Sequence, residues 1–294
     1  MIDALKSSVR KVLLRLVLSL TGKGARARVA LMDEIRRNRG GSLGVVHQRG
    51  QDWLVDGGDH LMWCASGDGL IAAGLAKHGA WQRDDLNHAF ATIEGLGIKR
   101  RGWFVDVGAN IGTHVVYAAH RPEIDRILAI EPEPRNFDFI CRNASVNGIE
   151  NRVTPLQLAV SDQPGKVHLE INEARQGQHI VRDDARDNTI EVAARSLDDI
   201  LTAHAIDPDD IALLWIDVEW HEHAVFRGMP SVLAAKVPVF FEYARASVPD
   251  DKRAAWRENV EALYDHAFVV HPEGARKVSF EEAFDQELAD ILIC

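Results

Sequence analysis

Residues 102–113 read GWFVDVGANIGT, and this stretch decides the fold. Residues 103–107 form a compact run of aromatic and β-branched side chains, which predicts a buried strand. Gly108 and Gly112 then mark a tight turn, and the pattern of residues 113–119 predicts a helix. The stretch therefore predicts a strand, a glycine turn and a helix in succession.

The same alternation continues along the chain. Further strands are predicted at 126–130, 153–160, 212–218, 238–243 and 267–271, and further helices at 137–144, 222–234 and 251–265. Residues 167–171 and 190–192 alternate apolar with polar side chains, which predicts an antiparallel ribbon. Strands separated by helices require right-handed crossovers, so we expect a doubly wound, mostly parallel α/β sheet with an added β-ribbon.

The 294 residues divide into three predicted parts. Residues 1–42 form a basic amphipathic helical extension, 43–100 an accessory N-terminal segment with short strands and a helix near 83–96, and 101–294 the α/β domain. Residues 1–40 carry a net charge of +7 within a chain total of −10, so residues 41–294 carry −17. A surface that acidic repels a phosphate backbone, and no nucleic-acid partner is expected.

The N-terminal extension leaves two interpretations open. Its helix packs against its own domain or a second subunit in a homo-oligomer, or residues 1–20 attach to an anionic membrane surface. Its longest apolar run, residues 12–20, contains Arg15 and is too short to span a bilayer. The three cysteines, Cys64, Cys141 and Cys294, form no Cys-x-x-Cys pair, so no zinc site is expected. Their odd number and wide spacing favour a reducing, cytoplasmic location.

A doubly wound sheet binds its ligand where the carboxyl ends of the strands meet. That rule gathers residues 106–112, Glu131, 159–162, 217–219 and Glu242 around one crevice. Gly108 and Gly112 are expected to leave room for a ligand against the backbone. Glu131 ends the second strand, where a carboxylate accepts both hydroxyls of a ribose, so an adenosine-bearing cofactor is predicted.

The glycine spacing distinguishes between two such cofactors. Dinucleotide folds use Gly-x-Gly-x-x-Gly, whereas this chain has Asn110 at the second glycine. An asparagine crowds a pyrophosphate and hydrogen-bonds an amino-acid group. The spacing therefore favours S-adenosylmethionine over NAD.

Five motifs in this order resemble those of FkbM-type methyltransferases. They are FVDVGANIGT (104–113), Glu131-Pro132 with Asn143 and Asn147 downstream, AVSD (159–162), SLDD (196–199) and WIDVE (215–219) followed by Glu222. The resemblance implies a class I, Rossmann-like methyltransferase fold and S-adenosylmethionine-dependent O-methylation of a hydroxyl on a sugar, glycan or polyketide. By the same motifs Asp106, Gly108, Asn110 and Gly112 line the methionine end of the cofactor, Glu131 the ribose and Asp162 the adenine.

This chain departs from the family at one position, since Trp220 stands where the family has a glycine after the acidic residue. The indole either lines an acceptor pocket or fills a gap beside the strand. Three residues near the strand ends are candidates for orienting or deprotonating the acceptor: Asp217 first, Glu242 second and His221 third.

Other interpretations of the same residues remain open. Asp217, Glu219 and His221 can share one side of an extended segment and hold a divalent metal, as in catechol-type methyltransferases, although no metal is expected. The chain can also be a non-catalytic S-adenosylmethionine-binding or interaction module. A nicotinamide-dependent oxidoreductase is disfavoured by Asn110.

Overall fold

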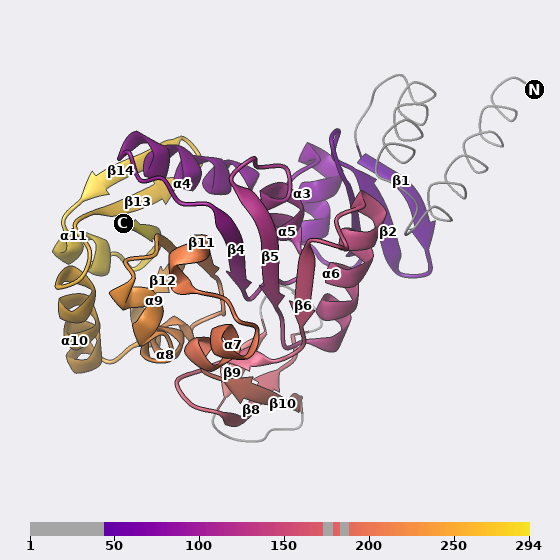
Figure 1. The fold of residues 1–294 in the computed structure, drawn as a ribbon. Helices are drawn as coiled ribbons and strands as arrows, with labels where there is room; N and C mark the ends of the chain where they lie inside the picture. The colour runs from indigo at the N-terminus through magenta and orange to yellow at the C-terminus, as the bar shows by residue number, and fades with distance from the viewer. Residues whose placement is uncertain (1–43, 173–178, 183–187) are drawn as a thin grey trace, which may run out of the picture.

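The computed structural model describes residues 44–172, 179–182 and 188–294, whose arrangement Figure 1 shows. The helical extension predicted for residues 1–42 lies outside these ranges, so its contacts stay predictions. Within the described ranges no helix has both the length and the apolar character needed to cross a membrane.

The centre of the molecule is an eight-stranded sheet with the order β14-β13-β15-β12-β11-β4-β5-β6. Its strands are β4 Gly102–Val107, β5 Ile124–Ile130, β6 Val153–Leu156, β11 Ile211–Ile216, β12 Val239–Ala244, β13 Ala267–His271, β14 Gly274–Val278 and β15 Leu288–Ile293. The five strands from β12 to β6 run parallel. β5, which follows β4 in the sequence, pairs with one side of β4, and β11, which comes later, pairs with the other side. The strand order therefore reverses between β4 and β11. This reversal is the place where a doubly wound sheet binds its ligand.

Alternate side chains of the parallel strands face two separate cores. Phe104 packs on one face of the sheet and Val105 on the other. The first face is covered by α3 Ile71–His78, α4 Arg83–Gly95, α5 Thr113–Ala118 and α6 Pro134–Asn147, and the second by α7 Leu197–Ala203, α8 Glu222–Arg227, α9 Pro230–Ala234, α10 Asp250–Glu261 and α11 Phe280–Phe284. The predicted doubly wound α/β fold is confirmed.

A smaller sheet has the order β7-β10-β8-β9. Its strands are β7 Ala159–Val160, β8 Gly165–Glu170, β9 Ile180–Arg182 and β10 Thr189–Arg195. The predicted ribbon is confirmed, since β8 and β10 pair antiparallel with Leu169 opposite Ile190. In Figure 1 this sheet lies at the edge toward which the arrows of β4 and β5 point. It therefore stands over the carboxyl ends of the large sheet.

The accessory segment contains β1 Gly44–Arg49, β2 Asp52–Asp56 and β3 Leu61–Ala65 as an antiparallel sheet, followed by α3 and α4. Two motif asparagines of α6 attach it to the domain. Asn143 exchanges hydrogen bonds with the backbone of Trp63, donating over 3.0 Å and accepting over 2.6 Å, and Asn147 does the same with Leu61. Residues 61–65 are thus held rigidly beside the glycine turn.

Three predicted elements are wrong in detail. The single strand predicted at 153–160 divides into β6 and β7, which belong to different sheets, because an apolar run does not specify its pairing partner. The helix predicted at 222–234 breaks at residues 228–230, where Pro230 cannot continue α8 and instead begins α9. The strand at 267–271 is not the last, since β14 and β15 follow and β15 inserts antiparallel between β12 and β13.

Candidate functional site

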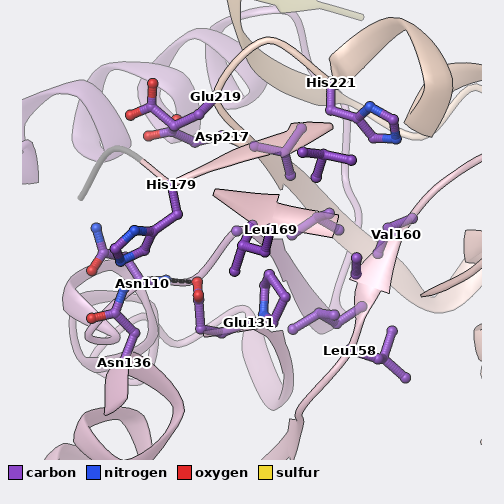
Figure 2. Close-up of a pocket in the computed structure, with 17 residues that line it drawn as sticks. Asn110, Glu131, Asn136, Leu158, Val160, Leu169, His179, Asp217, Glu219 and His221 are labelled. Atoms are coloured by element: carbon purple, nitrogen blue, oxygen red, sulfur yellow. Dashed lines mark hydrogen bonds between the residues drawn. The ribbon is translucent and has the colours of Figure 1, made fainter. Parts of the chain in front are cut away.

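A cavity opens at the carboxyl ends of β4, β5 and β11, under the small sheet. It spans about 570 Å³ of empty space, counting the part that is open to solvent, and Figure 2 shows its lining residues. Four structural elements contribute: the glycine turn, the end of β5, the β7 region with β8 and β9, and the loop after β11. The lining residues are Val107, Gly108, Asn110, Ile130, Glu131, Pro132, Asn136, Leu158, Ala159, Val160, Leu169, His179, Val181, Asp217, Val218, Glu219 and His221.

The glycine turn joins β4 to α5 and packs against the loop after β11. Gly108 has φ +86°, and a Cβ there would lie 1.7 Å from the carbonyl oxygen of Asp217. A Cβ on Gly112, which has φ +82°, would lie 3.4 Å from Ile140. The expectation that both glycines leave room for a ligand is therefore corrected. Gly108 lines the cavity but its missing side chain admits Asp217, and Gly112 starts α5 without lining it.

Asn110 has the left-handed φ of +51° and points its backbone N–H away from the helix. That N–H donates to Oε2 of Glu131 over 2.9 Å, as the dashed line in Figure 2 shows. The side-chain Oδ1 of Asn110 is buried and accepts no hydrogen bond from the described residues. Asn110 therefore lines the cavity with an unused acceptor, as expected of a residue that binds an amino-acid group.

Glu131 ends β5 and is 5% exposed. Its Oε2 accepts from Asn110 and its Oε1 from the N–H of Glu133, both over 2.9 Å. Burial raises the pKa of Glu131 to about 7 although these hydrogen bonds lower it. Each carboxylate oxygen has further acceptor capacity. The carboxylate is thus held rigidly at the cavity wall, where two neighbouring hydroxyls of a ribose would meet it.

Apolar side chains complete this wall. Pro132 follows β5 of the large sheet and Leu158 lies between β6 and β7. Ala159, Leu169 and Val181 belong to the small sheet. Such a narrow apolar slot beside a hydroxyl-binding carboxylate fits a nucleoside, whose flat base needs two apolar faces.

The structure does not bring Asp106 or Asp162 into the cavity lining. Asp106 is fully buried, and neither carboxylate oxygen has a partner among the described residues. Burial, with the charge of Glu131, raises the pKa of Asp106 well above its usual range. Asp162 is bound to Arg227 over 2.7 Å, and this partner lowers its pKa. The carboxylate of Asp106 is buried beneath the cavity wall and that of Asp162 has an arginine partner, and the contacts with the cofactor that the resemblance implies for these two residues stay predictions.

A cluster of carboxylates lies at the ends of β11 and β12. Among the described residues Asp217, Glu219 and Glu242 form the group that could hold a metal, with one oxygen from each within 4.8 Å of the others. Burial and the neighbouring carboxylates raise the pKa of Asp217 well above its usual range and that of Glu219 to about 8. Burial also raises the pKa of Glu242. The structure therefore brings together two of the three residues predicted for the transfer step.

His221 is separated from this cluster. Its Nε2 lies 3.1 Å from Oγ of Ser161, and the ring lines the cavity on the side of Val160. Figure 2 shows it apart from Asp217 and Glu219. His221 is also absent from the metal-binding group, so the predicted convergence of Asp217, Glu219 and His221 does not occur.

Trp220 lines neither this cavity nor the second one described below, and 48% of its surface is exposed. Its φ is +75°, a region that glycine adopts without strain. The loop around it is held by Glu222, which is 2% exposed and whose Oε1 accepts from the N–H groups of Val218 and Trp220 over 3.3 and 3.2 Å. The indole of Trp220 therefore neither lines a cavity of the site nor fills a buried gap beside the strand.

Two lining residues, Asn136 and His179, are not among the site residues predicted from the sequence. Asn136 lies five positions after Glu131, and this short separation is a signal that could have identified it. His179 precedes the short strand β9, in a polar stretch whose composition fits a cover over the crevice or a solvated ribbon loop. Figure 2 shows both residues beside Asn110, at the same end of the cavity.

A second cavity adjoins the first and spans about 640 Å³ of empty space, counting the part that is open to solvent. Gly108, Asn110, Asp217 and Glu219 line both cavities. The other walls of the second cavity come from the accessory segment, from α5 and from Glu242, through Asp68, Leu70, Ile71, Trp81, Gln82, Ala109, Thr113 and His114. The candidate site therefore consists of two adjoining cavities. They meet at a junction formed by the glycine turn and the loop after β11.

Comparison with known proteins places the chain in a family. Residues 106–268, more than half of the chain, match the model of the methyltransferase FkbM domain. The methyltransferase sdnD of Sordaria araneosa is 28% identical over 155 residues, which are 43% of this chain and 60% of that protein. This chain thus spans less than two thirds of that relative.

Two solved structures are similar to this chain at low sequence identity. The methyltransferase FkbM of Methylobacillus flagellatus is 16% identical with a TM-score of 0.44, over 67% of this chain and 45% of that chain. The TYW2 protein of M. jannaschii, in complex with AdoMet, is 13% identical with a TM-score of 0.42, over 84% of this chain and 86% of that chain.

The family match agrees with the five motifs and with the strand order of the large sheet. It confirms, at the level of the family, the class I methyltransferase fold and the S-adenosylmethionine cofactor expected from the sequence. On this match the chain belongs to the FkbM methyltransferase family.

Proposed function

We propose that this chain transfers the methyl group of S-adenosylmethionine to a hydroxyl on a saccharide, a glycan or a polyketide-type natural product. One observation carries the proposal: the cavity that holds the rigid carboxylate of Glu131 joins a second cavity at Asp217 and Glu219. A donor and an acceptor thus have separate places that meet at one wall.

The first cavity suits the donor. Glu131 is positioned for ribose hydroxyls, and the apolar slot beside Pro132 and Leu158 is positioned for adenine. Asn110 lies toward the junction with an unused acceptor for the amino-acid end. When bound, S-adenosylmethionine supplies a methyl group that is already activated by its sulfonium.

The chain's part in such a transfer is to orient the acceptor and to receive its proton. A bond forms between the acceptor oxygen and the methyl carbon as the carbon–sulfur bond breaks, and the electron pair stays on sulfur. The hydroxyl proton passes to a carboxylate at the junction. Asp217 lines both cavities and is the first choice for that group, with Glu242 on the acceptor side as the second.

Two other functions compete with this proposal. A nicotinamide-dependent oxidoreductase needs space for a pyrophosphate at the glycine turn, where Asn110 turns with a left-handed backbone and its side chain lines both cavities. A non-catalytic S-adenosylmethionine-binding module would lack a proton acceptor at the junction. The cluster of Asp217, Glu219 and Glu242 favours turnover over binding alone.

The proposal is tested in two steps on the full chain. Calorimetric titration with S-adenosylmethionine, S-adenosylhomocysteine and NAD should show binding of the first two and none of NAD. Transfer of a tritium-labelled methyl group to a cell extract should then be seen with the wild-type protein and be lost with Glu131→Ala. Binding of NAD alone, or donor binding without any labelled product, would refute the proposed function.

A further inference from the structure

The second cavity has an unusual chemical lining. None of its thirteen lining residues is a lysine or an arginine, whereas four are acidic. Asp68 is already used, because its Oδ1 accepts from the N–H groups of Leu70 and Ile71 over 2.8 and 3.1 Å. Asp217, Glu219 and Glu242 remain for a ligand, and they belong to the group whose oxygens lie within 4.8 Å of one another.

The one imidazole in this lining does not offset their charge. His114 is 6% exposed and its ring lies 4.2 Å from that of Trp215. Burial lowers the pKa of His114 to about 3, so the ring is neutral at physiological pH. Its Nε2 is buried without a partner among the described residues, and this unpaired polar atom in the cavity lining is independent of the carboxylates in favouring a polar ligand.

The polar atoms at the junction are mainly acceptors. Asn110 Oδ1 is unpartnered, and the three carboxylates accept hydrogen bonds when ionised. Burial and, after it, the charges of Glu242 and Glu222 raise the pKa of Glu219 to about 8, so ionised carboxylates at this place are unfavourable without a cation. A ligand that fills this cavity must therefore bring donors and positive charge.

The bound donor supplies only part of that charge. S-adenosylmethionine carries a sulfonium, an ammonium and a carboxylate, which together make one net positive charge. Asp217, Glu219 and Glu242 offer up to three negative charges, so further positive charge is accommodated at the acceptor side. An acceptor with a carboxylate or phosphate would instead add repulsion, because the described residues that line this cavity include no lysine or arginine.

We infer that the methyl acceptor carries a protonated amine next to the group that receives the methyl, as an amino sugar does, and that Glu219 and Glu242 bind this amine. The inference rests on the proposed function and narrows its substrate class. Trp81 and Leu70 also line this cavity and supply an apolar surface for the face of a sugar ring.

The test uses ligands that fill both cavities and needs no identified acceptor. Three bisubstrate analogues replace the sulfur of S-adenosylhomocysteine by nitrogen and carry an aminoethyl, a hydroxyethyl or a carboxymethyl arm on it. The arms are matched in size and differ in charge. Calorimetric titration of the full chain at pH 7.5 and low salt, without metal ions, should give binding of the aminoethyl analogue at least about 10-fold tighter than the hydroxyethyl one and about 100-fold tighter than the carboxymethyl one.

Two variants test which side chain causes the preference for the aminoethyl analogue. Glu242→Gln should reduce the ratio between the aminoethyl and hydroxyethyl analogues several-fold while leaving S-adenosylhomocysteine binding unchanged, which also shows that the variant folds. Glu94→Gln, an exposed glutamate of α4, is the matched control and should leave the ratio unchanged.

Other outcomes overturn the inference. Equal affinities of the aminoethyl and hydroxyethyl analogues would show that the cavity does not select an amine. Tight binding of the carboxymethyl analogue that requires added Mg²⁺ would show that a divalent cation occupies the carboxylate cluster instead. If neither S-adenosylhomocysteine nor any analogue binds, the proposed function itself fails, whereas binding of S-adenosylhomocysteine without charge preference refutes the acceptor class alone.

Discussion

The backbone N–H of Asn110 donates a 2.9 Å hydrogen bond to the carboxylate of Glu131 and ties the glycine turn to the end of β5. Asn110 itself has a left-handed backbone, with φ +51°. The bond fixes Glu131 before any ligand arrives, so its remaining acceptor capacity is preorganised. The donor cavity therefore depends on a contact between two turns 21 residues apart.

Glu131→Ala should weaken S-adenosylhomocysteine binding by about 10²-fold or more. Two charge-assisted hydrogen bonds to the ribose are lost, each worth roughly 1.5–3 kcal/mol. Calorimetric titration measures the change, with Glu94→Gln as a control of equal charge change. An unchanged dissociation constant would remove Glu131 from the donor site.

Asp217→Asn should retain donor affinity within about threefold while turnover falls by about 10²–10⁴-fold, the range for loss of a general base. Asparagine keeps the shape of the side chain but cannot accept the proton. Donor binding and turnover are measured on the same variant. A raised donor dissociation constant with unchanged turnover would show instead that Asp217 holds the methionine ammonium.

His221→Ala should raise the donor KM by about 3–10-fold and change kcat less than twofold, because the ring lines the donor cavity and its Nε2 contacts Ser161. Ser161→Ala is expected to have a weaker effect of the same kind. If kcat falls by 10²-fold with His221→Ala while KM stays constant, the ring serves the transfer step after all.

The ligand-free protein should lose stability as the pH rises from 6.5 to 8.5. The pKa values of Glu131, Glu222 and Asp290 are raised to about 7 and that of Glu219 to about 8, against about 4 for unfolded carboxyls. Across this window the folded state binds more protons than the unfolded state, so the free energy of unfolding falls with increasing pH.

Urea denaturation at pH 6.5, 7.5 and 8.5 should show a decrease of at least about 1 kcal/mol over this range. The window avoids lower pH, where protonation of His114, whose folded pKa is lowered to about 3, favours the unfolded state. Stability that rises with pH would contradict the raised carboxyl pKa values. Glu219→Gln should flatten the upper part of the profile.

Trp220→Gly should increase the free energy of unfolding by about 0.5–1 kcal/mol. The backbone at Trp220 has φ +75°, which costs a non-glycine residue about 1 kcal/mol or more, and its side chain is 48% exposed, so little packing is lost. Trp220→Ala is the matched control, since it removes the indole but keeps the backbone strain. A loss of more than about 1 kcal/mol in both variants would show that the indole packs against the protein.

The sequence alone determined the parallel sheet, the glycine turn and the role of Glu131 as the residue that ends β5. These features depend on local sequence patterns, because each strand lies within about ten positions of the turn or the polar residue that follows it. The five ordered motifs determined the family in the same way, by residue types at short spacings. The small sheet was predicted because alternation within residues 165–170 and 189–195 is also a local signal.

Only the tertiary structure decided which polar side chains reach the cavities. Asp106 packs inward, Asp162 pairs with Arg227, and His221 turns toward Ser161, none of which is visible in a strand-end motif. Burial and ion-pair partners of this kind depend on packing between distant segments.

The second cavity was likewise settled by tertiary contacts. It combines residues 68–82 with the glycine turn and the ends of β11 and β12, segments that lie up to 174 positions apart between Asp68 and Glu242. The hydrogen bonds of Asn143 and Asn147 to β3 hold the accessory segment there. A periodic pattern reports which face of an element is buried, but it does not report which distant element covers that face, and so the acceptor side of the site became visible only in three dimensions.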